Sequence, residues 1–181
     1  MDTVSVLFAA RNSVYHSLDG VEVYDAKRDA TTFDMSTPIV AHPPCRSWSA
    51  FTAHQAKPEP GEKELGLFAV DCLRKCGGIL EHPAHTRLFD AAGIPHPGQP
   101  SRDGLWSLQV WQAWWGYPMK KATWLAFSGI DSSKVETPFR LHSMGADRRR
   151  QQLMSKNQRA ATCLAFAQWL VNYSRTTEAP Y

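Results

Sequence analysis

The stretch Pro38-Ile39-Val40-Ala41-His42-Pro43-Pro44-Cys45 largely determines the fold that we expect for this chain of 181 residues. Its first half is short and apolar, as is typical of a buried strand, and the paired prolines end that strand. A cysteine that follows two prolines lies on a stiff backbone at the carboxyl end of a strand. Such a position suits a thiol that attacks an electrophilic carbon better than one that packs in a core.

Similar patterns continue on both sides of this stretch. Further short strands are predicted at Thr3–Ala9, Val21–Tyr24 and Ile79–Glu81, and an amphipathic helix at Glu62–Lys75. Strands that alternate with helices in the first ninety residues predict an α/β fold, with a Rossmann-like parallel sheet flanked by helices. Ligands of such sheets bind at the carboxyl ends of the strands. The residues expected at that edge are Ala9–Arg11, Asp25, His42–Cys45 and Glu81–His85.

The rest of the chain adds weaker elements. Arg11–Leu18 is predicted to form a short helix, Leu108–Trp115 and Thr123–Ser128 two strands, and Lys156–Tyr173 a final helix. A length of 181 residues suits one well-cored domain over residues 1–181. We therefore expect a compact single domain.

The composition excludes several classes of protein. Hydrophobic residues make up 43% of the chain and charged residues 20%, which excludes general disorder. No run approaches the roughly 18 apolar residues of a membrane-spanning helix, and the start, Met1-Asp2-Thr3-Val4, lacks a secretory pattern. The four cysteines fit a reducing compartment. A cytoplasmic protein with no membrane partner is expected.

The charge is unevenly distributed. Residues 1–100 carry nine Lys/Arg against twelve Asp/Glu, whereas residues 101–181 carry eleven against five. The densest basic cluster, Arg148-Arg149-Arg150, suits contact with the phosphates of a nucleic acid. A solvated charged face is the alternative.

Cys45 and Glu81 together indicate a specific chemistry. Each follows or ends a predicted strand, and the two strands are expected to be neighbours. A thiolate adds to carbon 6 of a pyrimidine, while a carboxyl group at ring N3 and the exocyclic amine accepts the developing charge. The pair therefore predicts an attack on a pyrimidine ring.

The chain resembles the cytosine carbon-5 DNA methyltransferases in segments that follow the family's order. Val6–Ala9 with Leu18–Val23 is similar to the family's first strand, cofactor loop and second strand, and Ala41–Ser49 (AHPPCRSWS) is similar to its Gly-Pro-Pro-Cys-Gln loop. Ile79–Pro83 (ILEHP) resembles the Glu-Asn-Val segment, and Trp115–Leu125 resembles the Gly-x-Pro-Gln-x-Arg-x-Arg segment.

The resemblance implies a role for each matching position. Cys45 is the implied nucleophile, and Glu81 binds and activates the ring. The residues expected to contact the substrate are His42, Pro44, Arg46, Trp48, Ser49, His82 and Lys121. The implied cofactor is S-adenosylmethionine, and the residues expected to hold it are Phe8, Ala10, Asn12 and either Asp25 or Asp29.

Two departures from the family are plain. The cofactor loop reads Phe8-Ala9-Ala10-Arg11-Asn12-Ser13, without the glycines of the family's Phe-Ala-Gly-x-Gly-Gly. The family's target-recognition domain is reduced here to a short basic insert, residues 130–159. Base flipping from a duplex usually needs more protein surface, so a nucleotide or single-stranded DNA is the expected substrate.

Other readings of the same residues are less favoured. His42-x-x-Cys45 and His82-x-x-His85 offer ligand types that suit zinc, but the spacings match no standard zinc module, and no metal is expected. The seven tryptophans are explained by core packing, with base stacking by Trp48 and by Trp114 or Trp115 as the alternative.

Two functions remain open. One is a cytosine-modifying enzyme that acts through Cys45 on DNA or a nucleotide, in the phage or prophage setting where trimmed relatives occur. The other is a non-catalytic protein on a degenerate methyltransferase fold that binds nucleic acid or a nucleotide, as a phage regulator or anti-defence factor.

Overall fold

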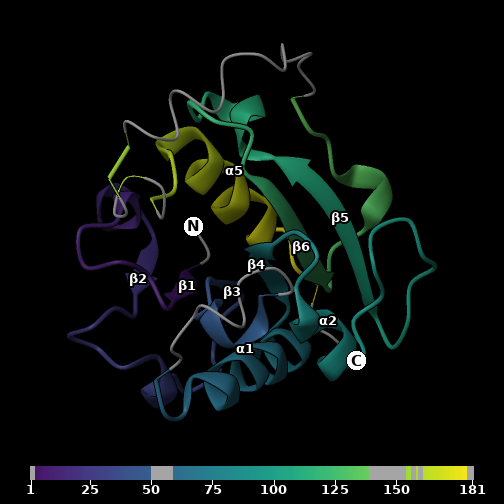
Figure 1. The fold of residues 1–181 in the computed structure, drawn as a ribbon, viewed down its shortest axis with the longest axis horizontal. Coiled ribbons are helices and arrows are strands. Elements are labelled where there is room, and N and C mark those ends of the chain that lie inside the picture. Colours follow the sequence, from purple (N-terminus) through teal and green to yellow (C-terminus); the bar gives the residue numbers. More distant parts are fainter. Residues whose placement is uncertain (1–2, 50–58, 139–153, 156–157, 159–160, 179–181) are drawn as a thin grey trace.

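The computed structural model describes residues 3–49, 59–138, 154–155, 158 and 161–178, and it is built around one six-stranded sheet (Figure 1). The strands lie in the order β2-β1-β3-β4-β6-β5. Their bounds are β1 (Val4–Leu7), β2 (Val21–Val23), β3 (Ile39–Ala41), β4 (Gly78–Pro83), β5 (Leu105–Trp111) and β6 (Ala122–Ser128). The first four strands are parallel, and β6 runs antiparallel to both β4 and β5. The α/β class is confirmed, and the strands of the first ninety residues are parallel as expected, whereas β5 and β6 make the sheet as a whole mixed.

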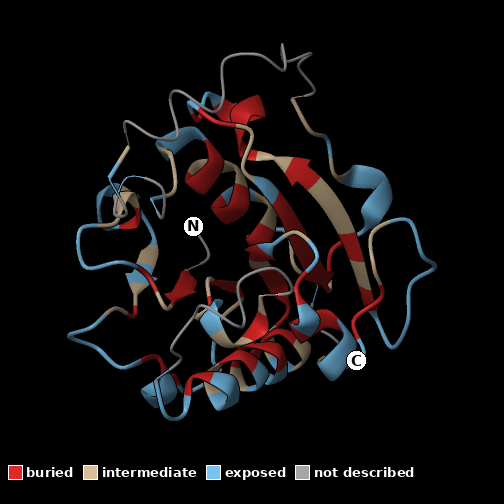
Figure 2. Ribbon diagram, viewed as in Figure 1, coloured by how far each residue is buried: buried red, intermediate tan, exposed pale blue. Residues whose placement is uncertain are grey.

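Helices cover both faces of this sheet. Figure 1 shows α1 (Glu62–Cys76) and α2 (Arg87–Ala92) on one face and α5 (Leu164–Ser174) on the other. Figure 2 shows the buried residues along the strands and on the helix faces that meet them, as expected for layers that exclude water from apolar surface. In the described part of the chain, no helix has the length and apolar character needed to cross a membrane.

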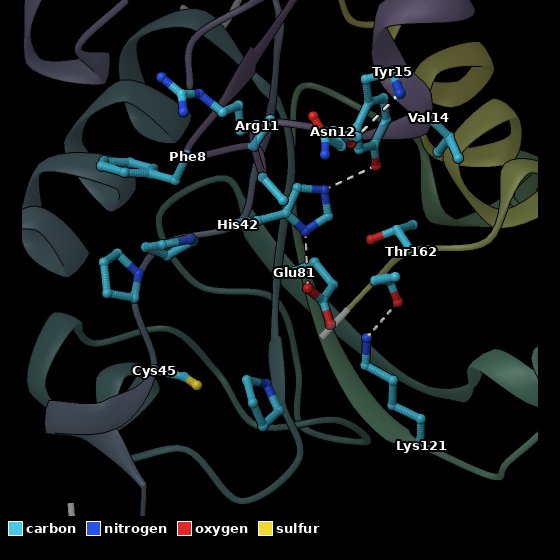
Figure 3. A pocket seen from close by; sticks show the side chains of 17 residues that line it. Phe8, Arg11, Asn12, Val14, Tyr15, His42, Cys45, Glu81, Lys121 and Thr162 are labelled. Carbon is cyan, nitrogen blue, oxygen red and sulfur yellow. Dashed lines mark hydrogen bonds and ion pairs between the residues drawn. The ribbon is translucent and has the colours of Figure 1, made fainter. Parts of the chain in front are cut away.

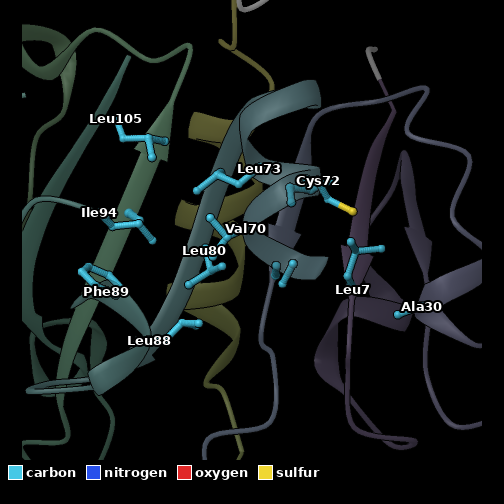
Figure 4. Close-up of a cluster of buried hydrophobic side chains, with 14 of the residues drawn as sticks. Leu7, Ala30, Val70, Cys72, Leu73, Leu80, Leu88, Phe89, Ile94 and Leu105 are labelled. Carbon is cyan, nitrogen blue, oxygen red and sulfur yellow. The ribbon is translucent and has the colours of Figure 1, made fainter. Parts of the chain in front are cut away.

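The core under α1 follows from the pattern of its sequence. Val70 and Leu73 of α1 pack against Leu80 of β4 and Leu88 of α2 (Figure 4). Acidic residues occupy the first turn of α1 and basic residues its last turn, where each sign of charge stabilises the helix dipole.

Gly78 brings β4 close to β3. It has a φ of 114°, and a Cβ at this position would overlap the carbonyl oxygen of Ile39, its partner in the register. Glycine is therefore required where α1 ends and β4 begins.

The core under α5 contains most of the tryptophan-rich segment. Trp114 and Trp115 are each 9% exposed, and the rings of Trp115 and Phe166 lie 4.7 Å apart. Packing therefore accounts for these two tryptophans, and the stacking role considered for them has no support here.

Several predicted bounds were wrong. The strand expected at Leu108–Trp115 lies at Leu105–Trp111, because residues 112–115 form a 3-10 turn that ends at Gly116 with a φ of 89°. Of the helix expected at Lys156–Tyr173, residues 156–157 and 159–160 lie outside the described residues, and α5 begins at Leu164, after the extended Cys163. The helix expected at Arg11–Leu18 is a shorter 3-10 turn, Val14–Ser17, and α2 was not predicted.

Candidate functional site

A pocket of about 730 Å3 opens at the carboxyl ends of β1, β3 and β4 (Figure 3). A pocket of this size holds a small organic ligand. The predicted site residues that line it are Phe8, Ala10, Asn12, His42, Pro44, Cys45, Glu81 and Lys121. The expected nucleophile Cys45, the carboxylate of Glu81 and the residues of the expected cofactor loop thus line the same cavity.

Cys45 presents a free thiol at this pocket. It directly precedes the 3-10 turn Arg46–Trp48 and follows the two prolines, so its backbone is held on both sides. The residue is exposed as a whole, yet partial burial of its sulfur raises the thiol pKa, and the negative charge of Glu81 raises it further. At neutral pH the sulfur therefore keeps its proton, and attack on a substrate requires a group that removes it.

Glu81 and His42 form a close pair at the centre of the pocket. Their side chains are 12% and 13% exposed, and a hydrogen bond of 2.9 Å joins His42 Nδ1 to Glu81 Oε2. Burial alone would raise the pKa of Glu81, but the hydrogen bond and the electrostatic interaction with His42, together with the positive charge of Lys121, lower it to about 2. Glu81 is therefore a carboxylate whose charge is offset by its neighbours.

Two further side chains complete this arrangement. The hydroxyl of Tyr15 lies 2.8 Å from His42 Nε2, and the residue is 1% exposed. On the opposite side, Gln112 Nε2 donates a hydrogen bond of 3.2 Å to Glu81 Oε1 and one of 3.1 Å to the hydroxyl of Thr123. Both oxygens of Glu81 are therefore engaged within the protein.

Sequence reasoning missed Tyr15 and Gln112. Tyr15 lies within a stretch expected to be a short helix, and Gln112 within an expected strand. A signal for Gln112 exists in the sequence, because it is a single polar residue inside the run Trp111-Gln112-Ala113-Trp114-Trp115. A polar side chain buried among tryptophans needs a hydrogen-bonding partner.

Lys121 lines the pocket but is already engaged. Its Nζ donates a hydrogen bond of 3.2 Å to the backbone oxygen of Ala161, and its ammonium lies 5.2 Å from the centre of the Tyr117 ring. Lys121 therefore supplies positive charge next to Glu81 while it holds the segment that leads into α5.

The residues after Cys45 lie outside the pocket lining. Arg46 pairs with the buried Glu62, at 2.7 Å between its guanidinium and Glu62 Oε1. Trp48 is 5% exposed and packs on α1 at Gly66, so the alternative of stacking on a base has no support. Ser49 follows the same turn and does not line the pocket. These residues anchor the loop that carries Cys45.

His82 faces away from the site, because side chains alternate along a strand and Glu81 takes the pocket side. It is 1% exposed, and burial lowers its pKa to about 4. The carbonyl of Pro44 is near enough to oppose this shift slightly, but neither ring nitrogen makes a hydrogen bond of good geometry.

The acids expected to bind a ribose are engaged elsewhere. Asp25 accepts hydrogen bonds from the backbone N–H groups of Lys27 and Arg28, and Asp29 accepts one from that of Thr31. Neither aspartate lines the pocket.

Residues 8–13, which correspond to the family's cofactor loop, line the pocket without filling it. Residues 8–15 all line it, and Phe8 has a left-handed backbone, with a φ of 62°. In Figure 3 the side chains of Phe8 and Arg11 lie along one side of the cavity and those of Glu81 and Lys121 along the other.

The remaining predictions concern the basic cluster and metals. Arg148, Arg149 and Arg150 lie outside the described residues. Within the described ranges, no three His, Cys, Asp or Glu side chains gather in a way that would hold a metal ion.

Comparison of the chain with protein-family models, with curated proteins and with solved structures finds no match.

Proposed function

We propose that the pocket binds a pyrimidine base and that Cys45 adds to carbon 6 of that base, as the first step in modifying cytosine in DNA or in a nucleotide. One observation carries this proposal: Cys45 and Glu81 line one pocket at the carboxyl ends of the adjacent parallel strands β3 and β4. This juxtaposition is the one on which the resemblance to cytosine carbon-5 methyltransferases depends. A methyltransferase-type sheet, and a phage-encoded protein in the bacterial cytoplasm, belong to the same proposal.

The surroundings of Cys45 support the addition step. The prolines before it and the Arg46–Glu62 pair after it restrict the loop, which reduces the entropy lost when the sulfur meets the ring. The thiol proton passes to His42, the imidazole that lines the same pocket, as the sulfur–carbon bond forms, and the ring takes up the negative charge. Lys121 and the His42–Glu81 pair are the groups in the pocket that can respond to this negative charge.

S-adenosylmethionine does not fit the described residues. Asp25 and Asp29, the acids expected to hold its ribose, do not line the pocket, and Ala10 and Arg11 stand where the family has glycines. The proposal therefore includes no step through this cofactor. Calorimetric titration with S-adenosylmethionine at up to millimolar concentration should show no binding, and measurable binding would overturn this conclusion.

A second function is favoured by a separate observation. Both oxygens of Glu81 are bound within the protein, and the pKa of Cys45 is raised, as expected of a site that holds a ligand without turnover. A protein that binds a nucleotide or nucleic acid on a degenerate fold would show these features.

Covalent trapping separates the two functions. A single-stranded oligonucleotide with 2-pyrimidinone in place of one cytosine presents an electrophilic carbon 6 to the thiol. The enzyme hypothesis expects an adduct by intact-mass spectrometry with the wild-type protein and none with Cys45→Ser. Cys72→Ser is the matched control, because Cys72 is buried in the core under α1. Binding without any adduct would favour the non-catalytic function.

A further inference from the structure

A continuous chain of hydrogen bonds runs from the pocket into the protein. It starts at the Tyr15 hydroxyl, passes through His42 and Glu81, and ends at Gln112 and Thr123. The successive distances are 2.8, 2.9, 3.2 and 3.1 Å. Burying the carboxylate of Glu81 would cost folding free energy if it had no partners, and the hydrogen-bond chain supplies those partners.

The partners determine where the proton on His42 lies. Burial raises the pKa of Tyr15 well above its ordinary value, and the charge of Glu81 raises it further, so the phenol keeps its proton. In a neutral His42 whose Nδ1 donates to the carboxylate of Glu81, Nε2 carries no proton and accepts a hydrogen bond from the Tyr15 hydroxyl. His42 then carries its proton on Nδ1 and donates it to the carboxylate of Glu81.

We propose that Tyr15 and His42 form a proton relay that takes a proton from, and returns it to, carbon 5 of the pyrimidine bound in this pocket. The relay rests on the proposed function, because only the addition of a thiol to carbon 6 makes carbon 5 basic. Its ligand is a cytosine base, and its acid–base group is the Tyr15–His42 pair with Glu81 behind it.

Each step balances in atoms and charge. The proton that the Cys45 thiol loses as its sulfur bonds to carbon 6 is taken up at His42 Nε2, which makes His42 an imidazolium. Carbon 5 then accepts a proton from the Tyr15 oxygen, and the Tyr15 oxygen regains one from His42 Nε2. In the reverse direction, a carbon 5 proton moves to the Tyr15 oxygen while the phenol proton moves to His42 Nε2. The electron pair left on carbon 5 re-forms the carbon 5–carbon 6 double bond, and the sulfur leaves as thiolate. The thiolate then recovers its proton from the imidazolium of His42, which restores the resting state.

Other groups at the pocket fit this task less well. Both oxygens of Glu81 already accept hydrogen bonds, and Lys121 has donors and no lone pair. Among the described residues that line the pocket, His42 is the only imidazole, and its Nε2 is hydrogen-bonded to the hydroxyl of Tyr15, which also lines the pocket.

Hydrogen exchange at carbon 5 in deuterated water tests the relay without any methyl donor. The substrates are deoxycytidine 5′-monophosphate and a single-stranded oligonucleotide with one cytosine, and mass spectrometry follows deuterium uptake. Tyr15→Phe and His42→Gln should each slow the exchange by about 100-fold or more, within the usual contribution of general acid–base catalysis. Tyr15→Phe should still form the 2-pyrimidinone adduct. Tyr24→Phe should exchange like the wild type, because the hydroxyl of Tyr24 is bound to Arg28 outside the pocket.

The outcomes separate the relay from the proposed function. The relay alone would be overturned if the wild-type protein forms the adduct and Tyr15→Phe exchanges hydrogen at a rate within about threefold of the wild type. Loss of both adduct and exchange in a folded Tyr15→Phe would overturn it in favour of a structural role for Tyr15. No adduct with the wild-type protein would overturn the proposed function, and the relay with it.

The position of the proton on His42 can be measured without substrate. Long-range nitrogen–proton NMR of protein labelled at histidine should show His42 with its proton on Nδ1, and Tyr15→Phe should shift the Nε2 resonance. A proton on Nε2 in the neutral ring would overturn the relay, whatever the pocket binds.

Discussion

Glu81 and His82 are neighbours in β4, and alternation of side chains along the strand gives them opposite surroundings. Glu81 faces the pocket and is held by His42 and Gln112, which keeps it ionised. His82 faces the core under α1, where neither of its nitrogens has a hydrogen bond of good geometry, and burial keeps it neutral. β4 thus places the ionised Glu81 on one face of the sheet and the neutral His82 on the other.

The electrostatic link between Glu81 and Cys45 leads to a prediction at the level of single residues. Partial burial raises the pKa of Cys45, and the charge of Glu81 raises it further. Glu81→Gln removes that charge and keeps the shape, so Cys45 should be alkylated faster near pH 8, by a few-fold. The measurement is the rate of iodoacetamide labelling at Cys45 between pH 7 and 10, read by peptide mass spectrometry.

Glu22→Gln is the control for this experiment, because Glu22 pairs with Arg28 and does not line the pocket. Its labelling rate should match that of the wild type. If Glu81→Gln leaves the rate and its pH dependence unchanged, the charge of Glu81 does not reach the Cys45 sulfur.

Among the elements, those with a strong local pattern were predicted best. The amphipathic repeat of Glu62–Lys75 and the glycines after it gave α1 to within one residue. The tryptophan-rich run gave the wrong strand bounds, because aromatic residues are favoured both in strands and in the turn that packs on α5.

The candidate site was predictable only in part, for a related reason. Cys45 and Glu81 stand out because each lies at the end of an apolar run. The partners of the His42–Glu81 pair come from distant parts of the chain, with Tyr15 27 residues from His42 and Gln112 31 residues from Glu81. No local pattern encodes such pairings, and only the folded sheet brings them together.

The contact between α1 and the loop that follows Cys45 gives a prediction at the level of elements. A Cβ on Gly66 would overlap the indole nitrogen of Trp48, which is buried against this helix. Gly66→Ala should therefore destabilise the protein by about 1–3 kcal/mol, although alanine is the better helix former by about 1 kcal/mol. Because Trp48 shares the turn that begins after Cys45, labelling of Cys45 should change as well.

Leu67→Ala is the matched control in the same helix, because Leu67 is 40% exposed. It should change the free energy of unfolding, measured by urea titration, by about 0.5 kcal/mol or less. A Gly66→Ala protein that is more stable than the wild type would show that helix propensity outweighs the Trp48 contact.

At the level of the whole molecule, the hydrogen-bond chain joins the two parts of the sheet. Tyr15 lies in the turn between the parallel strands β1 and β2, and His42 directly follows β3. Gln112 lies in the turn that joins β5 to β6, Thr123 lies on β6, and Glu81 on β4 connects the two groups. Polar groups this enclosed lose stability when a partner is removed. The candidate site is thus also part of what holds the hairpin against the parallel strands.

The response to acid follows from the two neighbours on β4. The pKa of His82 is lowered from 6.5 to about 4. Between pH 6.5 and 4, His82 is therefore protonated in the unfolded chain but neutral in the folded protein, which favours unfolding. Stability should fall by about 3 kcal/mol between pH 6.5 and 4 from this group. The pKa of Glu81 is lowered from 4.5 to about 2, so its contribution is complete above pH 4.5 and is lost as the pH falls toward 2.

Variants at the two positions should therefore lose different parts of the acid response. In urea unfolding followed by circular dichroism, His82→Leu should flatten the fall between pH 6.5 and 4, and Glu81→Gln should keep that fall but flatten the one below pH 4.5. His85→Asn is the control for removing a histidine, because His85 is exposed and asparagine tolerates its positive φ of 63°. If His82→Leu loses stability with pH as steeply as the wild type does, then His82 is protonated in the folded protein, and the acid response has its origin elsewhere.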